Sequence, residues 1–208
     1  MTGEIQIKLD QAQLTRVYSM LSEIKNGPEK AIVKAINTTL TKLKTEASKI
    51  IRAKVALKKA KVDEFIELFK ANYEKISGSM RLSGSRIGAI HYGARQTAQG
   101  ITIKIKTAGP RSLVAHGFLA NVKKSGNAAD VQAYRRKYTG PRAKWNKNKP
   151  YAKMPKLYRF PIEKITGPSI PEVAGYSEVL SQIMGAASVL FVARLEYETN
   201  EVLRRAKL

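Results

Sequence analysis

Residues 31–51 read AIVKAINTTLTKLKTEASKII and show the clearest periodic pattern in the chain. Apolar residues recur there every three or four positions, the spacing that lines one face of an α-helix. They are Ile32, Ile36, Leu40, Leu43, Ala47 and Ile50. The chain break Asn26-Gly27-Pro28 precedes them, and proline is well tolerated in the first turn of a helix. The pattern therefore predicts a long amphipathic helix that begins near Pro28.

The segments on either side of this helix are also expected to be regular. Residues 4–9 alternate between polar and apolar, which predicts a half-buried strand, and Asp10 suits the N-cap of a short helix that reaches about Ile24. Residues 58–73 have helical spacing of their large apolar side chains and are predicted to form another helix. We expect residues 1–76 to fold as a strand plus helices.

The character of the sequence changes after Ser77, where glycines separate short runs. Residues 101–106 alternate cleanly, and residues 117–122 and 157–162 are the next strand candidates. These patterns predict a small, mostly antiparallel sheet within residues 77–165, with one polar face.

The last segment, residues 166–208, has helical spacing from Val173 to Val202. Its residues 179–193 form an uncharged stretch of 15 residues, which is shorter than the roughly 20 that a membrane-spanning helix needs. We interpret it as a helix that is buried in the core or shared with a partner. The whole chain, residues 1–208, is then predicted to be a single domain of the α+β class.

Charge is the most unusual property of the composition. The 208 residues include 38 lysines and arginines against 16 acidic residues, which gives a net charge of +22, while 43% hydrophobic residues indicate a folded protein. Residues 77–165 alone hold 19 basic and 2 acidic residues, whereas residues 166–208 hold 4 and 5. Such a charge favours a polyanionic partner: nucleic acid, an anionic membrane or the acidic face of another protein.

Residue types that usually carry catalysis or bind metals are scarce. The chain has no cysteine and only two histidines, His91 and His116, and it lacks the glycine fingerprints of phosphate-binding loops. Residues 77–165 offer only Asp130 and Glu163 as carboxylates. We therefore expect no enzymatic activity, no cofactor and no metal, and we interpret both histidines as packing or hydrogen-bonding residues.

Residues 134–156 are predicted to form a long exposed basic loop. They contain no acidic residue, and their prolines and glycines disfavour regular structure. Aromatic residues interleave with the cations, so the segment could neutralise phosphates while its rings stack on unpaired bases. It equally fits a solvated arm, or one that becomes ordered against an acidic neighbouring subunit. The sequence leaves these alternatives open.

Candidate contact residues come from this loop and from the predicted sheet, where Lys104 and Lys106 should point outward. Each is a cation or a large aromatic that can touch DNA or an acidic protein, and Trp145 and Tyr151 are the candidate anchors. The set comprises Arg95, Lys104, Lys106, Arg135, Arg136, Lys137, Arg142, Lys144, Trp145, Lys147, Lys149 and Tyr151.

Several segments together resemble the minor tail protein Z family of long-tailed bacteriophages and prophages. They follow one another in the same order as in the family, between about residues 30 and 175, with a C-terminal helix after them. The segments are AINTTLTKLKTEASKIIR (35–52), GARQT (93–97) followed by GITIKIK (100–106), HGFLA (116–120) and PIEKITGPSIP (161–171). The basic loop 134–156 departs from the family by being longer and more basic.

The resemblance implies a structural protein of the virion, without catalytic activity, that acts in tail completion and head–tail joining at the head-proximal end of the tail. It also implies a closed ring, because identical subunits around a tube are most simply arranged as a ring. A hexamer would match the usual tail tube. Its partners would be further copies of itself, other tail and neck proteins, and DNA in the lumen, but no membrane. The N-terminus lacks a secretory signal, so synthesis is expected in the host cytoplasm. A non-specific nucleic-acid-binding protein is the alternative.

Overall fold

The computed structural model describes residues 2–6, 11–121, 131–136 and 162–206. The chain divides into two compact units. The first unit contains Met1–Lys54, Lys58–Ser85 and Ser169–Leu208, and the second contains Val55–Leu57 and Arg86–Pro168. Both helices and small antiparallel sheets are present, which confirms the α+β class.

The first unit is built from helices and one three-stranded sheet. Its elements in chain order are β1 (Thr2–Gln6), α1 (Gln11–Met20), α2 (Gly27–Lys54), α3 (Lys59–Asp63), β2 (Ile66–Phe69), β3 (Ser79–Ser83), α5 (Ile170–Ala174) and α6 (Ser177–Ala206). The long helix predicted near Pro28 is confirmed as α2, and the short helix before it is confirmed as α1, which ends earlier than expected, at Met20. The predicted cap Asp10 lies outside the described residues.

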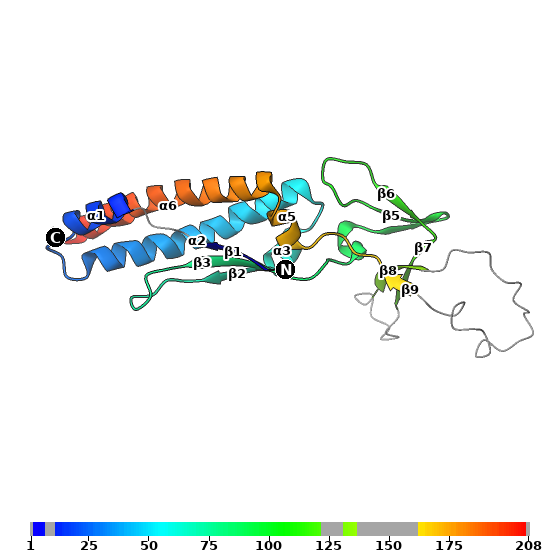
Figure 1. The fold of residues 1–208 in the computed structure, drawn as a ribbon, viewed down its shortest axis with the longest axis horizontal. Coiled ribbons are helices and arrows are strands. Elements are labelled where there is room, and N and C mark those ends of the chain that lie inside the picture. Colours follow the sequence, from blue (N-terminus) through cyan, green and yellow to red (C-terminus); the bar gives the residue numbers. More distant parts are fainter. Residues whose placement is uncertain (1, 7–10, 122–130, 137–161, 207–208) are drawn as a thin grey trace, which may run out of the picture. The chain divides into compact units, whose positions relative to one another are not determined.

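The helix α2 packs against α6 along most of its length (Figure 1). The apolar stripe predicted for α2 is buried from Ile32 to Ala47, but it continues through Ile51, which is fully buried, rather than Ile50. Lys34 pairs with Glu198 and Lys54 pairs with Glu178, so partners lie 20 residues apart on each helix. The two helices are therefore antiparallel and keep one register over about 30 Å.

The sheet of the first unit packs against α2 as well (Figure 1). Its strand order is β1-β3-β2, with antiparallel pairing that sets Met80 of β3 between Ile5 and Leu68. Met80 is fully buried. The chain reaches β3 through Gly78, where an added Cβ would lie 2.6 Å from Ile36 Cγ2 of α2. Only glycine allows the backbone to approach the helix this closely.

The prediction of one helix over residues 58–73 is wrong. The helix α3 ends at Asp63, and Ile66–Phe69 forms strand β2 at the edge of the sheet. A short apolar run fits either a helix or a strand, and here pairing with β3, more than ten residues away, decided the outcome. The strand β3, which was not predicted, lies within residues 77–165 but belongs to the first unit.

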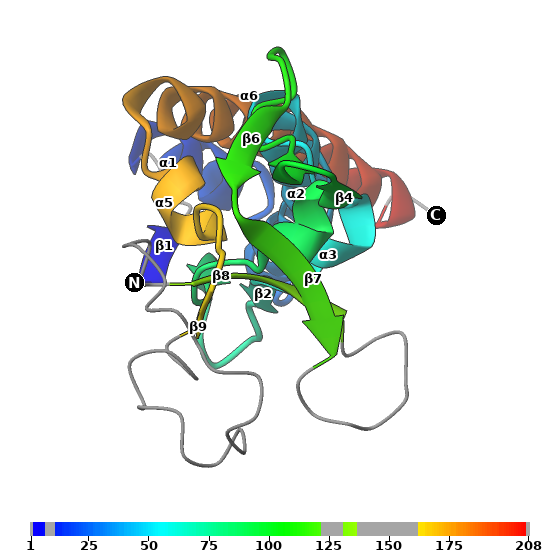
Figure 2. The ribbon, with the colours of Figure 1, turned by 90° about the vertical axis from the view of Figure 1, so that its right-hand side faces the viewer.

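The second unit contains two three-stranded antiparallel sheets and a short 3₁₀ helix, η1 (Ala89–Tyr92) (Figure 2). One sheet has the order β4-β5-β6 and the other β7-β8-β9. The strands are β4 (Arg95–Thr97), β5 (Gly100–Ile103), β6 (Ser112–Ala115), β7 (Gly117–Asn121), β8 (Val131–Arg136) and β9 (Ile162–Lys164). The antiparallel arrangement predicted for this part of the chain is confirmed.

The core of the second unit is small. Ala89, Ile101, Ile103 and Ala133 are buried together, and Tyr92 is buried beside Gly167. The Tyr92 hydroxyl donates a hydrogen bond to the Pro168 carbonyl at 2.8 Å. A buried phenol with a satisfied hydroxyl anchors the segment that leaves this unit.

In the second unit one predicted strand and the start of the basic loop differ from the expectation, and two further predicted strands lie partly outside the described residues. The strand expected over 101–106 ends at Ile103, and the one expected over 117–122 is described as far as Asn121. The third candidate, 157–162, overlaps the described residues only at Ile162, where β9 begins. The basic loop predicted to start at Tyr134 starts later, because Tyr134–Arg136 belong to strand β8.

The C-terminal part of the chain is helical as predicted, but it is divided. Ser169 and Glu172 form a capping box at the start of α5, which ends at Ala174, and α6 begins at Ser177. By length and composition alone α6 is able to cross a membrane, with a mean hydropathy of 1.4 over its most apolar window. The predicted absence of a membrane partner stays a prediction.

Candidate functional site

Positive charge is concentrated in the second unit. Its described residues (55–57, 86–121, 131–136 and 162–168) include one carboxylate, Glu163, against eight cations. The cations are Arg86, Arg95, Lys104, Lys106, Arg111, Arg135, Arg136 and Lys164. Such an imbalance produces a positive potential that attracts polyanions, and salt screens it over about 10 Å.

Three predicted contact residues lie at or near the sheet β4-β5-β6. Arg95 is exposed on β4 opposite Thr102 of β5, Lys104 is half-buried just after β5, and Lys106 is exposed at a backbone bridge to Val55. No ion pair joins these cations to a carboxylate among the described residues. Their charge is therefore available to a partner without breaking an internal ion pair.

Two further predicted residues, Arg135 and Arg136, lie on strand β8 instead of in a loop. Arg135 forms an ion pair with Glu163 of β9, so its charge is partly neutralised. The guanidinium of Arg136 lies 5.9 Å from the centre of the Phe118 ring, and Phe118 lies 6.1 Å from Tyr134. Tyr134 and Arg136 share one face of the strand because side chains two positions apart point the same way. This aromatic and cationic cluster is on a rigid strand pair.

Two structural residues of this region were missed by sequence reasoning. Arg111 donates hydrogen bonds to the Gly93 and Thr102 carbonyls and to the Thr102 hydroxyl. Its side chain therefore links the residue before β6 to β5 and to Gly93. Gln96 donates to the Gly100 carbonyl at 3.0 Å and accepts from the Leu119 amide at 3.0 Å, which links β4 to β5 and β7. Neither role could be predicted from local sequence, because the hydrogen bonds from Arg111 to Gly93 and from Leu119 to Gln96 join residues 18 and 23 positions apart.

The remaining predicted contact residues cannot be placed. They lie outside the described residues and comprise Lys137, Arg142, Lys144, Trp145, Lys147, Lys149 and Tyr151. Whether the basic loop contacts DNA or protein thus stays a prediction.

Both histidines are exposed. His91 is in η1, and His116 has a left-handed backbone with φ of 58°, its amide donating to the Gln99 carbonyl. Among the described residues no group of three histidine or acidic side chains is placed to hold a metal ion. The expectation of a non-enzymatic protein stays a prediction.

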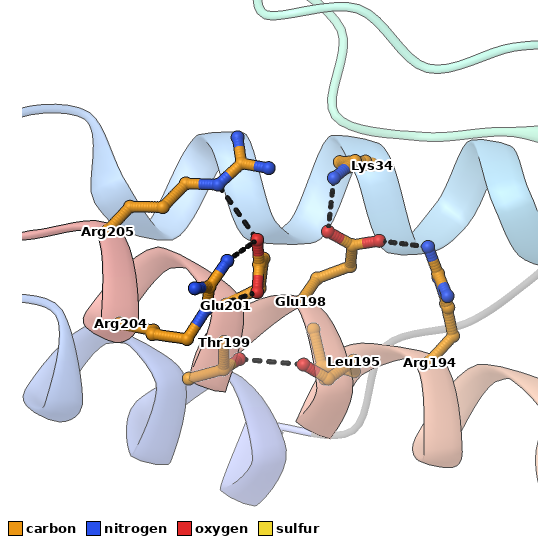
Figure 3. A network of polar contacts seen from close by, with 8 residues as sticks. All are labelled: Lys34, Arg194, Leu195, Glu198, Thr199, Glu201, Arg204 and Arg205. Carbon is orange, nitrogen blue, oxygen red and sulfur yellow. Dashed lines mark hydrogen bonds and ion pairs between the residues drawn. The ribbon is translucent and has the colours of Figure 1, made fainter.

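A polar network links α2 and α6 in the first unit (Figure 3). The carboxylate of Glu198 is almost fully buried and forms ion pairs with Lys34 of α2, at 2.8 Å, and with Arg194 of its own helix. One turn earlier in the same helix, the Leu195 carbonyl accepts a hydrogen bond from the Thr199 hydroxyl at 2.8 Å. A buried carboxylate needs such partners because burial without them is costly. The network therefore fixes how the two helices meet.

The last turns of α6 carry a second cluster. Glu201 accepts hydrogen bonds from the guanidinium groups of Arg204 and Arg205 at 2.9–3.0 Å. These two arginines, acting first through the hydrogen bonds and then through their charge, lower the pKa of Glu201 to about 2. Glu201 therefore stays ionised at neutral pH.

The outward side of α6 carries no charged residue between Glu178 and Arg194. Leu180, Met184, Val189 and Val192 are exposed by 36% or more, although they are large and apolar. One side of the helix is buried, as the core interpretation predicted, and the other side is exposed. The alternative, that the helix is shared with a partner, stays a prediction. A surface helix usually carries polar and charged residues opposite its buried side, so this face is unusual.

No protein-family model, curated protein or solved structure matches the chain.

Proposed function

We propose that this chain is a non-catalytic structural protein of a long bacteriophage tail, which forms a ring at the head-proximal end and joins the tail to the neck. The ordered set of segments that resembles the minor tail protein Z family supports this function. Its fold contributes two surfaces that suit a ring subunit: a basic sheet unit and an apolar helix face.

The observation that carries the proposal is the segregation of charge. The described residues of the second unit have eight cations and one carboxylate, while α6 exposes an uncharged face in the first unit. A subunit between rings needs one surface for copies of itself and another for DNA in the lumen or for acidic neighbouring rings. Arg95, Lys104 and Lys106 are the described cations that we assign to this second contact.

Electron microscopy of assembled particles tests the proposal. Particles made without this chain should have tails that fail to join heads, and restoring the chain should restore joining. In intact particles, density for the chain should lie at the head-proximal end of the tail tube. Density elsewhere along the particle, or normal joining without the chain, would refute the proposal.

The second candidate is a non-specific nucleic-acid-binding protein. The cluster of Arg136, Phe118 and Tyr134 favours it, because cations beside aromatic rings can hold a phosphate backbone and stack on bases. It predicts that the purified chain binds DNA of any sequence and that affinity falls steeply with salt. Filter binding at two salt concentrations separates the candidates, since a tail protein needs only weak binding outside the particle.

A further inference from the structure

Helix α6 has two ridges on opposite sides. The buried ridge, at four-residue intervals, consists of Val179, Ile183, Ala187, Phe191 and Leu195. A second series, displaced by two positions, is exposed throughout and consists of Ser181, Gly185, Val189, Ala193 and Tyr197. Two positions correspond to about 200° around a helix, so the second series, which we name the outer ridge, faces away from α2.

The outer ridge is unusually apolar for an exposed surface. Val189 is 71% exposed, and no charged residue occurs between Glu178 and Arg194. Only 28% of the most apolar window of α6 is buried within the chain. A surface helix ordinarily places charged residues opposite its buried face, so this side fits contact with another surface better than contact with water.

The shape of the outer ridge suits a second helix. Ridges of residues four positions apart pack into the matching grooves of a neighbouring helix. A Cβ added at Gly185 would meet nothing within 4 Å, and three of the five ridge residues are glycine, alanine or serine. Small side chains allow a neighbouring backbone to come close, which increases the dispersion contacts per residue.

We propose that the outer ridge of α6 is an interface with a second copy of this chain. The inference rests on the self-assembly in the proposed function and assigns the surface that performs it. Two chains of charge +22 repel each other over most of their surfaces, and the uncharged ridge is where they meet with the least repulsion. The guanidinium of Arg194 lies 4.4 Å from the centre of the Tyr197 ring at the end of the ridge, but it is already paired with Glu198. An acidic partner or nucleic acid would therefore find no unpaired cation among the five ridge residues.

A lipid surface fits the ridge less well than a protein does. Two ion pairs hold α6 against α2: Lys54 with Glu178 in its first turn, and Lys34 with Glu198 about two turns before its end. Its outer side is the side that stays exposed. That side includes the polar side chains of Ser181, Gln182 and Ser188. Hydroxyl and amide groups hydrogen-bond readily across a protein interface but are costly in hydrocarbon.

The test is Gly185→Glu in the full chain, followed by sedimentation equilibrium in about 0.3 M salt, where charge repulsion is screened. The outer ridge would bury only part of the area of a standard protein–protein interface. We therefore expect the wild-type chain to self-associate with a dissociation constant in the micromolar range. Gly185→Glu should raise the dissociation constant about tenfold or more, because it places a charge against an apolar partner. The substitution lowers the net positive charge, so general repulsion cannot explain a loss of association.

The matched control is Thr45→Glu, which makes the same charge change at an exposed position of α2. It should leave association within about twofold of wild type. Thermal unfolding should show that Gly185→Glu is at least as stable as wild type, since glutamate favours a helix more than glycine does. Val192→Glu provides a second variant at the edge of the ridge.

Three results would overturn the inference. The wild-type chain could be monomeric at about 200 µM, a concentration above the expected dissociation constant. The Gly185→Glu chain could associate normally, or the wild-type chain could bind pure phosphatidylcholine vesicles and lose this binding in Gly185→Glu. The last result would assign the ridge to lipid. Failure here is distinguishable from failure of the proposed function, because microscopy locates the chain in particles whichever surface forms the contact.

Discussion

At the scale of single residues, the buried carboxylate of Glu198 is the group whose environment matters most. It is 1% exposed and is held by Lys34, which is 52% exposed, and by Arg194. The sequence contains nothing that distinguishes Glu198 from Glu196, its exposed neighbour two positions earlier. Only the packing of α2 on α6 buries Glu198 and gives it a structural role.

Replacing Glu198 with glutamine should destabilise the first unit. The amide keeps the shape of the side chain but removes the charge that compensates Lys34 and Arg194. We expect the free energy of unfolding to fall by about 1–2 kcal/mol. This is less than for a fully buried pair, because Lys34 is half-exposed and water screens its charge. Denaturant unfolding measures this loss. Glu196→Gln on the exposed side of the same helix should change stability by less than about 0.5 kcal/mol. Equal effects of the two substitutions would contradict the assigned role.

Glycine positions provide a second residue-scale prediction. Gly78→Ala should destabilise by about 1–3 kcal/mol, because its Cβ would lie 2.6 Å from Ile36 and 2.8 Å from Leu40. Gly185→Ala should instead stabilise by up to about 1 kcal/mol, because the site is open and alanine favours the helix. Thermal unfolding of the two variants at low protein concentration compares them. A stable Gly78→Ala variant would show that β3 does not approach α2 this closely.

At the scale of elements, the antiparallel pair of α2 and α6 organises the first unit. Buried apolar side chains supply the contact, and ion pairs near both ends set the register. The last turns of α6 are held differently, by exposed charges around Glu201. We therefore expect the carboxyl end of α6 to respond to pH and its middle to respond to changes in apolar volume.

Acid should loosen the carboxyl end of α6. Its neighbouring arginines lower the pKa of Glu201 from 4.5 to about 2 in the folded chain. Because the pKa is lower in the folded chain than in the unfolded chain, ionised Glu201 stabilises the fold at pH values above the unfolded-state pKa. This contribution is lost as the pH falls from about 4.5 through 2. NMR titration of the Glu201 carboxyl measures its pKa directly. In Arg204→Gln/Arg205→Gln the pKa should return toward its ordinary value, and a pKa near 4.5 in the wild-type chain would contradict the prediction.

At the scale of the whole molecule, the net charge of +22 is distributed unevenly between the two units. Many cations of the first unit have carboxylates nearby, and five of its lysines form ion pairs. The second unit has one carboxylate among its described residues. Polyanion binding should consequently depend on where a cation lies and not only on how many are present.

Neutralising the second unit should weaken polyanion binding selectively. The triple variant Arg95→Gln/Lys104→Gln/Lys106→Gln should reduce the slope of log affinity against log salt for single-stranded DNA by about 2, from three lost phosphate contacts. Filter binding over a series of salt concentrations measures the slope. Lys25→Gln/Lys42→Gln/Lys58→Gln removes the same charge from exposed positions of the first unit and should change the slope little. Similar slopes for both triples would mean that only net charge matters.

Local patterns in the sequence determined the helices α1, α2 and α6, the strands β5 and β7, the α+β class and the concentration of charge in the middle of the chain. These features follow from periodicity and composition, which are properties of neighbouring residues. The tertiary structure alone decided that Ile66–Phe69 is a strand, that Tyr134–Arg136 lie on β8, that Glu198 is buried and that the outer ridge of α6 is exposed. Each of these depends on a segment distant in sequence, and strand pairing and burial are set by such distant partners.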